Sequence, residues 1–177
     1  MLTLVLGGAR SGKSTYAQSL CGRGPVVYLA TATAADDEEM QRRIDRHRQS
    51  RPSDWTTVEA PLDLPAAVDS VAQDATVLVD CITVWISNLL WTWRDLEASA
   101  LQDRVLECVD DLSVAARQRQ MIAVSNEVGS GVVPSHPVAR LFRDVQGLAN
   151  QRLARAAERV VLVTAGIPLV LKSEGRE

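Results

Sequence analysis

The chain has 177 residues, 46% of them hydrophobic, so it is long enough to bury one compact core but short for two. Its 22 Asp and Glu slightly outnumber its 19 Lys and Arg, so no broad basic field exists to hold a nucleic-acid backbone. The 3 Cys residues share no CxxC spacing, which argues against a disulfide framework or a zinc site and fits a reducing compartment. We therefore expect a single domain over residues 1–172, a flexible tail at 173–177, and no nucleic-acid partner.

The first predicted element is a strand at Leu2–Leu6, an apolar run that stops at Gly7 and lacks the basic flank of a secretion signal. No later apolar run approaches the roughly 18 residues that a membrane span needs. We expect a cytoplasmic protein that does not insert into a membrane.

A phosphate-binding motif directly follows this strand. The residues Gly7-Gly8-Ala9-Arg10-Ser11-Gly12-Lys13-Ser14 match GxxxxGK[ST], and a helix is predicted to begin near Lys13. Glycines permit backbone conformations closed to other residues, so successive N–H groups and the start of the helix can point at phosphates. Lys13 would neutralise charge on the β- and γ-phosphates, and the Ser14 hydroxyl would ligate Mg²⁺. The alternative, a chance match in a glycine-containing turn, is weakened because Lys13 is one of only two Lys in the chain.

Alternating strands and helices follow this motif. Further strands are predicted at Val26–Ala30, Thr76–Val79, Met121–Ser125 and Val160–Thr164. Helical patterns occupy Asp36–Arg48, Pro65–Gln73, Ile82–Trp93, Asp95–Arg119 and Val138–Glu158. This alternation predicts an α/β fold with a mostly parallel sheet and helices on both faces. The segment Leu169–Leu171 would add a small antiparallel edge hairpin, and ligands would bind at the carboxyl ends of the parallel strands.

An acid ends the strand at Thr76–Val79. Asp80 has the position of a Walker B carboxylate, which holds Mg²⁺ through water or acts near the metal. The same residue could instead cap the helix that follows. Because the phosphate-binding motif needs a metal partner, we favour Asp80 as a catalytic and metal-binding acid.

The segment after the second strand is rich in charge. The acidic run Asp36–Glu39 begins a helix whose other end carries Arg and His residues, an arrangement that the helix dipole explains by itself. The dipole does not explain His47, which shares a helix face with Met40 and Ile44 and is predicted to turn toward the apolar interior. A His at a helix end can be a cap, a core residue or a catalytic group, and the pattern leaves these alternatives open.

Several stretches together resemble one enzyme family. They are Gly7–Ser14, Tyr28–Thr31, His47–Pro52, Asn126–Gly129 with Gly131–Pro134, and Asn150–Leu153. In this order they are similar to the bifunctional adenosylcobinamide kinase/adenosylcobinamide-phosphate guanylyltransferases of cobalamin biosynthesis, over Met1 to about Lys172. The phosphate-binding motif is generic, whereas the HxxxRP and NEVGxGxVP patterns are specific to that family.

This resemblance implies a two-step transferase with a RecA-like P-loop NTPase core that forms a homotrimer. ATP or GTP would phosphorylate adenosylcobinamide, and GTP would then donate GMP to that phosphate with release of pyrophosphate. GMP would first be carried on a histidine, whose position is matched here by His47 and is preceded by Arg46 where some relatives have a second His. Beside the Gly7–Ser14 loop, the resemblance implies guanine-nucleotide contacts at Thr31, Ala32, Thr33, Arg48, Gln49, Ser50, Arg51, Glu59 and Asp80.

Two other functions remain open from the sequence. A P-loop kinase of another small alcohol would use Lys13, Ser14 and Asp80 but would need no nucleophilic His. A non-enzymatic nucleotide-sensing module would bind GTP without consuming it. Covalent labelling by GTP and steady release of pyrophosphate would distinguish the bifunctional enzyme from both.

Overall fold

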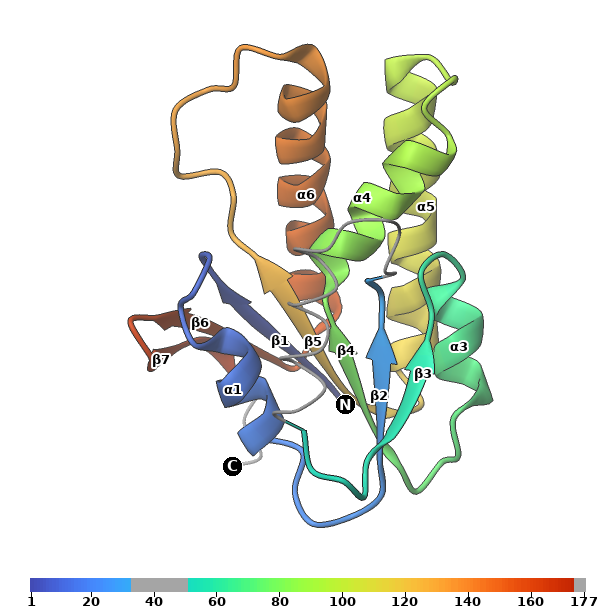
Figure 1. Ribbon diagram of the computed structural model, residues 1–177, viewed down its shortest axis with the longest axis vertical. Helices are drawn as coiled ribbons and strands as arrows, with labels where there is room; N and C mark the ends of the chain where they lie inside the picture. Colours follow the sequence, from blue (N-terminus) through green and yellow to red (C-terminus); the bar gives the residue numbers. More distant parts are fainter. Residues whose placement is uncertain (33–50, 174–177) are drawn as a thin grey trace.

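The computed structural model describes residues 1–32 and 51–173, which are arranged around one seven-stranded sheet (Figure 1). The strands are β1 (Leu2–Gly7), β2 (Val26–Ala30), β3 (Thr56–Glu59), β4 (Thr76–Asp80), β5 (Gln120–Asn126), β6 (Arg159–Thr164) and β7 (Ile167–Ser173). Their order across the sheet is β3-β2-β4-β5-β1-β6-β7, and only β6 and β7 pair in antiparallel fashion. The strand that leads into the phosphate-binding motif, β1, therefore lies inside the sheet between β5 and β6.

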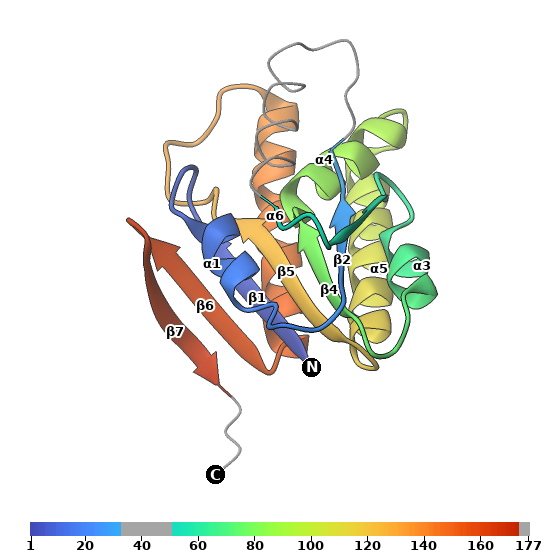
Figure 2. The same ribbon diagram turned by 60° about the horizontal axis from the view of Figure 1, so that its bottom comes forward.

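Helices cover the two faces of this sheet unequally. They are α1 (Lys13–Ser19), α3 (Leu64–Ser70), α4 (Ile82–Thr92), α5 (Ala98–Ala116) and α6 (Pro137–Ala156). Figure 2 shows α1 on one face, and the other four of these helices pack on the opposite face. In β5, Met121 and Ala123 enter this four-helix core, whereas Ile122 and Val124 enter the smaller core beneath α1, here called the α1 core. Strands buried on both faces are mostly apolar along their length, which explains why they could be predicted from sequence.

Local chemistry fixes several helix ends. Asp63 caps α3, since its Oδ1 accepts a hydrogen bond from Ala66 N at 3.3 Å. At the carboxyl end of α6, the last carbonyl groups have no partner within the helix and need external donors. Lys172 of β7 supplies these donors to the carbonyl oxygens of Ala154 (3.3 Å), Arg155 (3.2 Å) and Ala157 (2.6 Å).

The structure confirms the predicted α/β class, with a mostly parallel sheet, helices on both faces and an antiparallel hairpin at one edge. The predicted strands begin and end within two residues of the observed ones, and β7 extends to Ser173, one residue past the predicted domain end. The sequence does not predict β3, because its TTVE segment has one apolar residue and lies largely exposed at the sheet edge. The predicted helix Asp36–Arg48 lies outside the described residues. No helix in the described part of the chain is both long enough and apolar enough to cross a bilayer.

Candidate functional site

The loop between β1 and α1 has the backbone of an anion-binding site. Arg10 and Gly12 have positive φ angles of 58° and 91°, a conformation in which consecutive N–H groups can converge on one anion. The helix α1 begins at Lys13, directly after Gly12, and its start has no side-chain cap. Lys13 Nζ donates a hydrogen bond to Gly8 O at 3.1 Å, so the ammonium group folds back over the loop.

Close backbone contacts support this loop from two directions. A side chain at Gly7 would place its Cβ 2.4 Å from Ser11 Oγ and 2.6 Å from the backbone oxygen of Val163 in β6. The turn between β6 and β7 also contacts the loop, because Gly166 N donates to Ser11 O at 2.8 Å. A Cβ at Gly12 would lie 3.2 Å from Gly166 Cα. The edge hairpin is therefore part of the support of the phosphate loop.

Strand pairing brings the other predicted site residues to the same edge of the sheet. Ala30 pairs with both Glu59 and Asp80, and Gly7 pairs with Asn126. One strand, β5, separates the Asp80 strand from β1, so a spacing of about 4.8 Å between neighbours puts β4 and β1 about 10 Å apart. The phosphate loop and Asp80 are therefore about two strand spacings apart across the sheet.

The pKa of the Cys81 thiol depends on its burial and on the charges around the end of β4. Burial, and then the negative charge of Asp80, raise the pKa of Cys81 to about 11, whereas the nearby charge of Lys13 lowers it. A thiol with this pKa stays protonated near neutral pH, so Cys81 does not have the reactivity of a nucleophile.

A tyrosine of the neighbouring strand contacts Asp80. The Tyr28 hydroxyl donates a hydrogen bond to Asp80 Oδ2 at 2.9 Å. Tyr28 pairs with Leu78, so Asp80, two residues further along β4, points to the same face of the sheet, toward the α1 core. Burial, followed by the charge of Asp80, raises the pKa of Tyr28 above its ordinary range, so the phenol remains a proton donor. A cis peptide bond joins Asp80 to Cys81.

Arg51 stacks on the same tyrosine. Its guanidinium carbon lies 3.3 Å from the centroid of the Tyr28 ring, and its Nη1 donates to Thr57 Oγ1 of β3 at 3.3 Å. Arg51, Tyr28 and Asp80 therefore form one line of contacts that starts beside β3 and ends at the carboxyl end of β4.

Thr31 and Asn88 fix the turn after Asp80. Thr31 is 0% exposed, and its hydroxyl donates to Cys81 O at 2.8 Å and accepts from Cys81 N at 3.0 Å. Asn88 of α4 donates its Nδ2 to Thr31 O at 2.8 Å and to Pro61 O at 3.0 Å. These bonds place the Thr31 side chain inside the protein, where it supports the backbone that carries Asp80.

A buried polar network supports the end of β5. Ser125 and Gln146 are both 0% exposed, and Gln146 Nε2 donates to Ser125 Oγ at 2.9 Å. Ser125 Oγ donates to Asn150 Oδ1 at 2.7 Å, and Asn150 Nδ2 donates to Asn126 O at 3.0 Å. Asn126 N donates to Thr83 Oγ1 of α4 at 2.8 Å. Both backbone groups of Asn126 are thereby fixed next to the phosphate loop.

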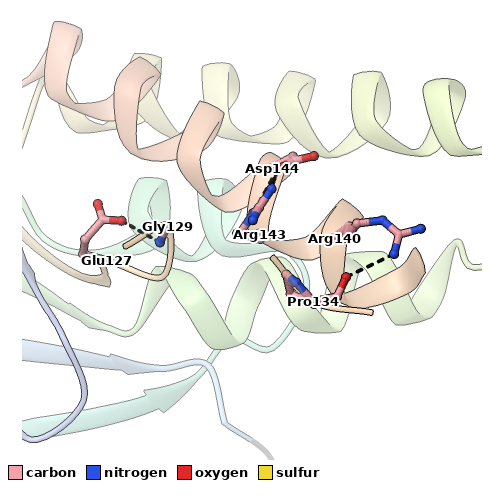
Figure 3. Close-up of polar contacts among 6 residues, drawn as sticks. All are labelled: Glu127, Gly129, Pro134, Arg140, Arg143 and Asp144. Atoms are coloured by element: carbon pink, nitrogen blue, oxygen red, sulfur yellow. Dashed lines mark hydrogen bonds and ion pairs between the residues drawn. The ribbon is translucent and has the colours of Figure 1, made fainter. Parts of the chain in front are cut away.

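The loop 127–136 leaves this strand end and leads into α6 (Figure 1), and Figure 3 shows polar contacts near its two ends. Glu127 Oε1 accepts a hydrogen bond from Gly129 N at 2.7 Å, which closes the start of the loop. Figure 3 shows Arg140 reaching back from α6, where its Nη1 donates to Pro134 O at 3.1 Å. Between these two fixed points the loop is exposed, and Val132 is 96% exposed.

The oxygen groups at this edge suit Mg²⁺. This ion prefers oxygen ligands and is usually held by one or two protein groups together with substrate phosphates and water. Ser14 at the start of α1 and Asp80 at the end of β4 are half-buried and offer such oxygens. Within residues 1–32 and 51–173, no group of three or more His, Cys, Asp or Glu side chains could hold a metal ion by itself. Ser14 and Asp80 would hold the ion together with the nucleotide phosphates.

Comparison with known proteins identifies the family. The family model described as cobinamide kinase / cobinamide phosphate guanyltransferase matches residues 3–171. The chain belongs to this family. It is 42% identical to the bifunctional adenosylcobalamin biosynthesis protein CobU of Salmonella typhimurium, over 97% of this chain and 100% of that protein. It is also 42% identical to the bifunctional adenosylcobalamin biosynthesis protein CobP of Pseudomonas aeruginosa, over 98% of this chain and 99% of that protein.

Solved structures of distant proteins share the fold. A protein of Pyrococcus horikoshii OT3 has a TM-score of 0.54 at 11% identity, over 99% of this chain and 87% of that chain. An ATPase of the type III secretion system of pathogenic bacteria has a TM-score of 0.53 at 12% identity, over 92% of this chain and 51% of that chain. These identities are too low to compare activities, so the likeness concerns the fold alone.

The predicted site residues of this family member fall into three groups. The phosphate loop Gly7–Ser14, Asp80 and Glu59 lie at one edge of the sheet. Thr31 and Arg51 lie beside the same edge, where their side chains contact Cys81 and Tyr28, and Ala32 follows Thr31. Five predicted residues lie outside the described residues, and their roles stay predictions: Thr33, His47, Arg48, Gln49 and Ser50.

Sequence reasoning missed two contributors to the site. The sequence pattern places Tyr28 only within a predicted strand, although a tyrosine in a buried strand usually needs a hydrogen-bond partner for its hydroxyl. That signal predicts a partner without saying which residue it is. Gly166 supports the phosphate loop from far along the chain, and no local pattern could have indicated the contact.

Proposed function

We propose that the chain phosphorylates adenosylcobinamide with ATP or GTP and then uses GTP to convert the phosphate to adenosylcobinamide-GDP in cobalamin biosynthesis. The observation that carries this proposal is the match of residues 3–171 to the family model. The phosphate loop supports it, because its glycines and positive φ angles suit the backbone of a nucleotide site. A homotrimer in the cytoplasm is part of the proposal and rests on the resemblance alone.

In the first step the substrate hydroxyl attacks the γ-phosphorus of the nucleotide. An oxygen–phosphorus bond forms, the bond to the β–γ bridging oxygen breaks, the nucleoside diphosphate leaves, and the hydroxyl proton passes to solvent. The N–H groups of the Gly7–Ser14 loop would hold the phosphates, and Lys13 would offset the charge that builds on the bridging oxygen. Ser14 and Asp80 would hold Mg²⁺, which would supply positive charge to offset that of the phosphates.

In the second step we propose His47 as the carrier of GMP. A neutral imidazole, with an unperturbed pKa of about 6.5, attacks the α-phosphorus of GTP, so a nitrogen–phosphorus bond forms and pyrophosphate leaves. The phosphate of adenosylcobinamide phosphate then attacks the same phosphorus. The nitrogen–phosphorus bond breaks, and protonation lets the imidazole depart as a neutral group. Arg48 and Arg51 would offset charge on the phosphates.

Incubation with GTP labelled at the α-phosphorus, followed by denaturation, tests this assignment. The parent protein should carry an acid-labile, base-stable label, whereas His47→Ala should carry none and should make no GDP-corrinoid. Its phosphorylation of adenosylcobinamide should largely persist, because that step uses Lys13. His136 is the other of the 2 His residues and is exposed at the start of α6, so His136→Ala is the matched control and should keep the label. The same label on His47→Ala would disprove the assignment.

Label incorporation, activity with adenosylcobinamide and release of pyrophosphate together distinguish the alternatives. A kinase of another small alcohol would show no label on the parent protein and no activity with adenosylcobinamide. A nucleotide-sensing module would release no pyrophosphate when adenosylcobinamide phosphate is present.

A further inference from the structure

We propose that Tyr28 is a positioning residue for Asp80, whose carboxylate it holds in the orientation needed at the metal–nucleotide site. This inference rests on the proposed function, in which Asp80 binds the metal ion. Tyr28 itself would touch neither nucleotide nor metal.

The geometry constrains Tyr28 at both ends of its side chain. The residue is 2% exposed and lies in β2, which is paired on one side with β3 and on the other with β4. Its ring packs in the α1 core, and the Arg51 guanidinium group stacks on it at 3.3 Å from the centroid. Arg51 is held in turn by its hydrogen bond to Thr57 of β3. The ring therefore has little freedom to move.

This fixed ring presents its hydroxyl to one carboxylate oxygen. The bond of 2.9 Å from Tyr28 to Asp80 Oδ2 has an ionised acceptor, so it is stronger than a bond between neutral groups. A carboxylate on a short side chain can rotate about two torsions, and a fixed donor selects one orientation among them. The second carboxylate oxygen is thereby given a defined direction at the end of β4.

A purely structural role would explain the same contact, because a buried hydroxyl needs an acceptor. The two roles predict different effects on the Mg²⁺ requirement of nucleotide binding. If Tyr28 only stabilises the fold, its hydroxyl can be removed without changing the Mg²⁺ requirement of nucleotide binding. If Tyr28 orients Asp80, removal of its hydroxyl raises the Mg²⁺ requirement of nucleotide binding, whereas the affinity for nucleotide without metal is unchanged.

The variant Tyr28→Phe keeps the ring and the Arg51 stack and removes only the hydroxyl. Calorimetric titration of GTP should show unchanged affinity without Mg²⁺, and the Mg²⁺ concentration for half-maximal enhancement should rise about 10- to 100-fold. Tyr16→Phe is the matched control, since Tyr16 is the other of the 2 Tyr residues and its hydroxyl accepts from Arg159 at 3.2 Å. An unchanged Mg²⁺ requirement in Tyr28→Phe would overturn the inference.

A double-mutant comparison separates this inference from the proposed function. Asp80→Asn should raise the Mg²⁺ requirement by itself, and adding Tyr28→Phe to it should change the requirement no further. If Asp80→Asn has no effect, the proposed metal role of Asp80 fails. If Asp80→Asn has its effect but the second substitution adds its own, Tyr28 acts elsewhere and only the inference fails.

A spectroscopic measurement keeps the test open should Tyr28→Phe fold poorly. Incorporation of 3-fluorotyrosine into the Tyr16→Phe protein leaves Tyr28 as the single fluorinated residue. Addition of Mg²⁺ to the GTP complex should shift its fluorine resonance, and Asp80→Asn should remove that shift. If the fluorine resonance of the Tyr16→Phe protein does not shift on addition of Mg²⁺, the inference is contradicted.

Discussion

The two sides of the site are built by different means. On the β1 side, the phosphate loop is shaped by its backbone, through glycine conformations and contacts with Val163 and Gly166. On the β4 side, Asp80 is positioned by the Tyr28 side chain, and the turn after it by Thr31. Backbone geometry tolerates little change at a few glycines, whereas a side-chain assembly can lose one bond and keep its shape. The β1 side should therefore fail abruptly on substitution and the β4 side gradually.

The largest loss is expected for Lys13→Ala. Removal of a charge that acts on the transferred phosphate should reduce kinase turnover about 100- to 1,000-fold, with the protein still folded. Lys172→Ala is the matched control, because Lys172 is the only other Lys. It bonds the carboxyl end of α6 and pairs with Val160 at the amino end of β6, away from the carboxyl ends of the parallel strands. The control substitution should lower the melting temperature and leave turnover near that of the parent. Turnover near the parent value in Lys13→Ala would show that this loop is not the kinase site.

The next largest effect is expected for Gly7→Ala, which tests directly whether close backbone contacts shape the phosphate loop. The added Cβ meets the backbone oxygen of Val163 at 2.6 Å, and a backbone atom inside a sheet cannot move aside cheaply. We expect the free energy of unfolding to fall by about 2 kcal/mol and nucleotide binding to weaken. A Cβ at Gly8 has nothing within 4 Å, so Gly8→Ala should retain the parent stability in denaturant titrations. Equal stability of the two variants would contradict the proposed support.

The smallest effect on turnover is expected on the β4 side, where side chains build the site, for Thr31→Val. The substitution keeps the shape but removes both hydrogen bonds to the Cys81 backbone, which should cost about 1 to 3 kcal/mol of stability. Turnover should fall only severalfold. Thr92→Val is a suitable control, since Thr92 is exposed and its hydroxyl donates to the Asn88 carbonyl of its own helix. A loss of turnover as large as that of Lys13→Ala would mean that Thr31 acts on the nucleotide itself.

The same contrast explains how much could be predicted from the sequence. The Gly7–Ser14 loop and the buried strands were predictable because their signals lie in consecutive residues. The Tyr28–Asp80 contact was not, because its partners are 52 positions apart and meet only once β2 pairs with β4. The edge strand β3 was missed because an exposed strand carries no continuous apolar run. The role of His47 came from resemblance, and it remains a prediction.

The position of β1 in the sheet also bears on how the chain is made. β1 comes first among the strands, yet its two neighbours are β5 and β6, so it stays without a partner through most of synthesis on the ribosome. Domain folding during synthesis requires contacting segments to have emerged together. We expect the phosphate loop to become protease-resistant only after β6 has left the exit tunnel. Stalled chains of increasing length, treated with protease, would show whether protection of β1 begins there or earlier.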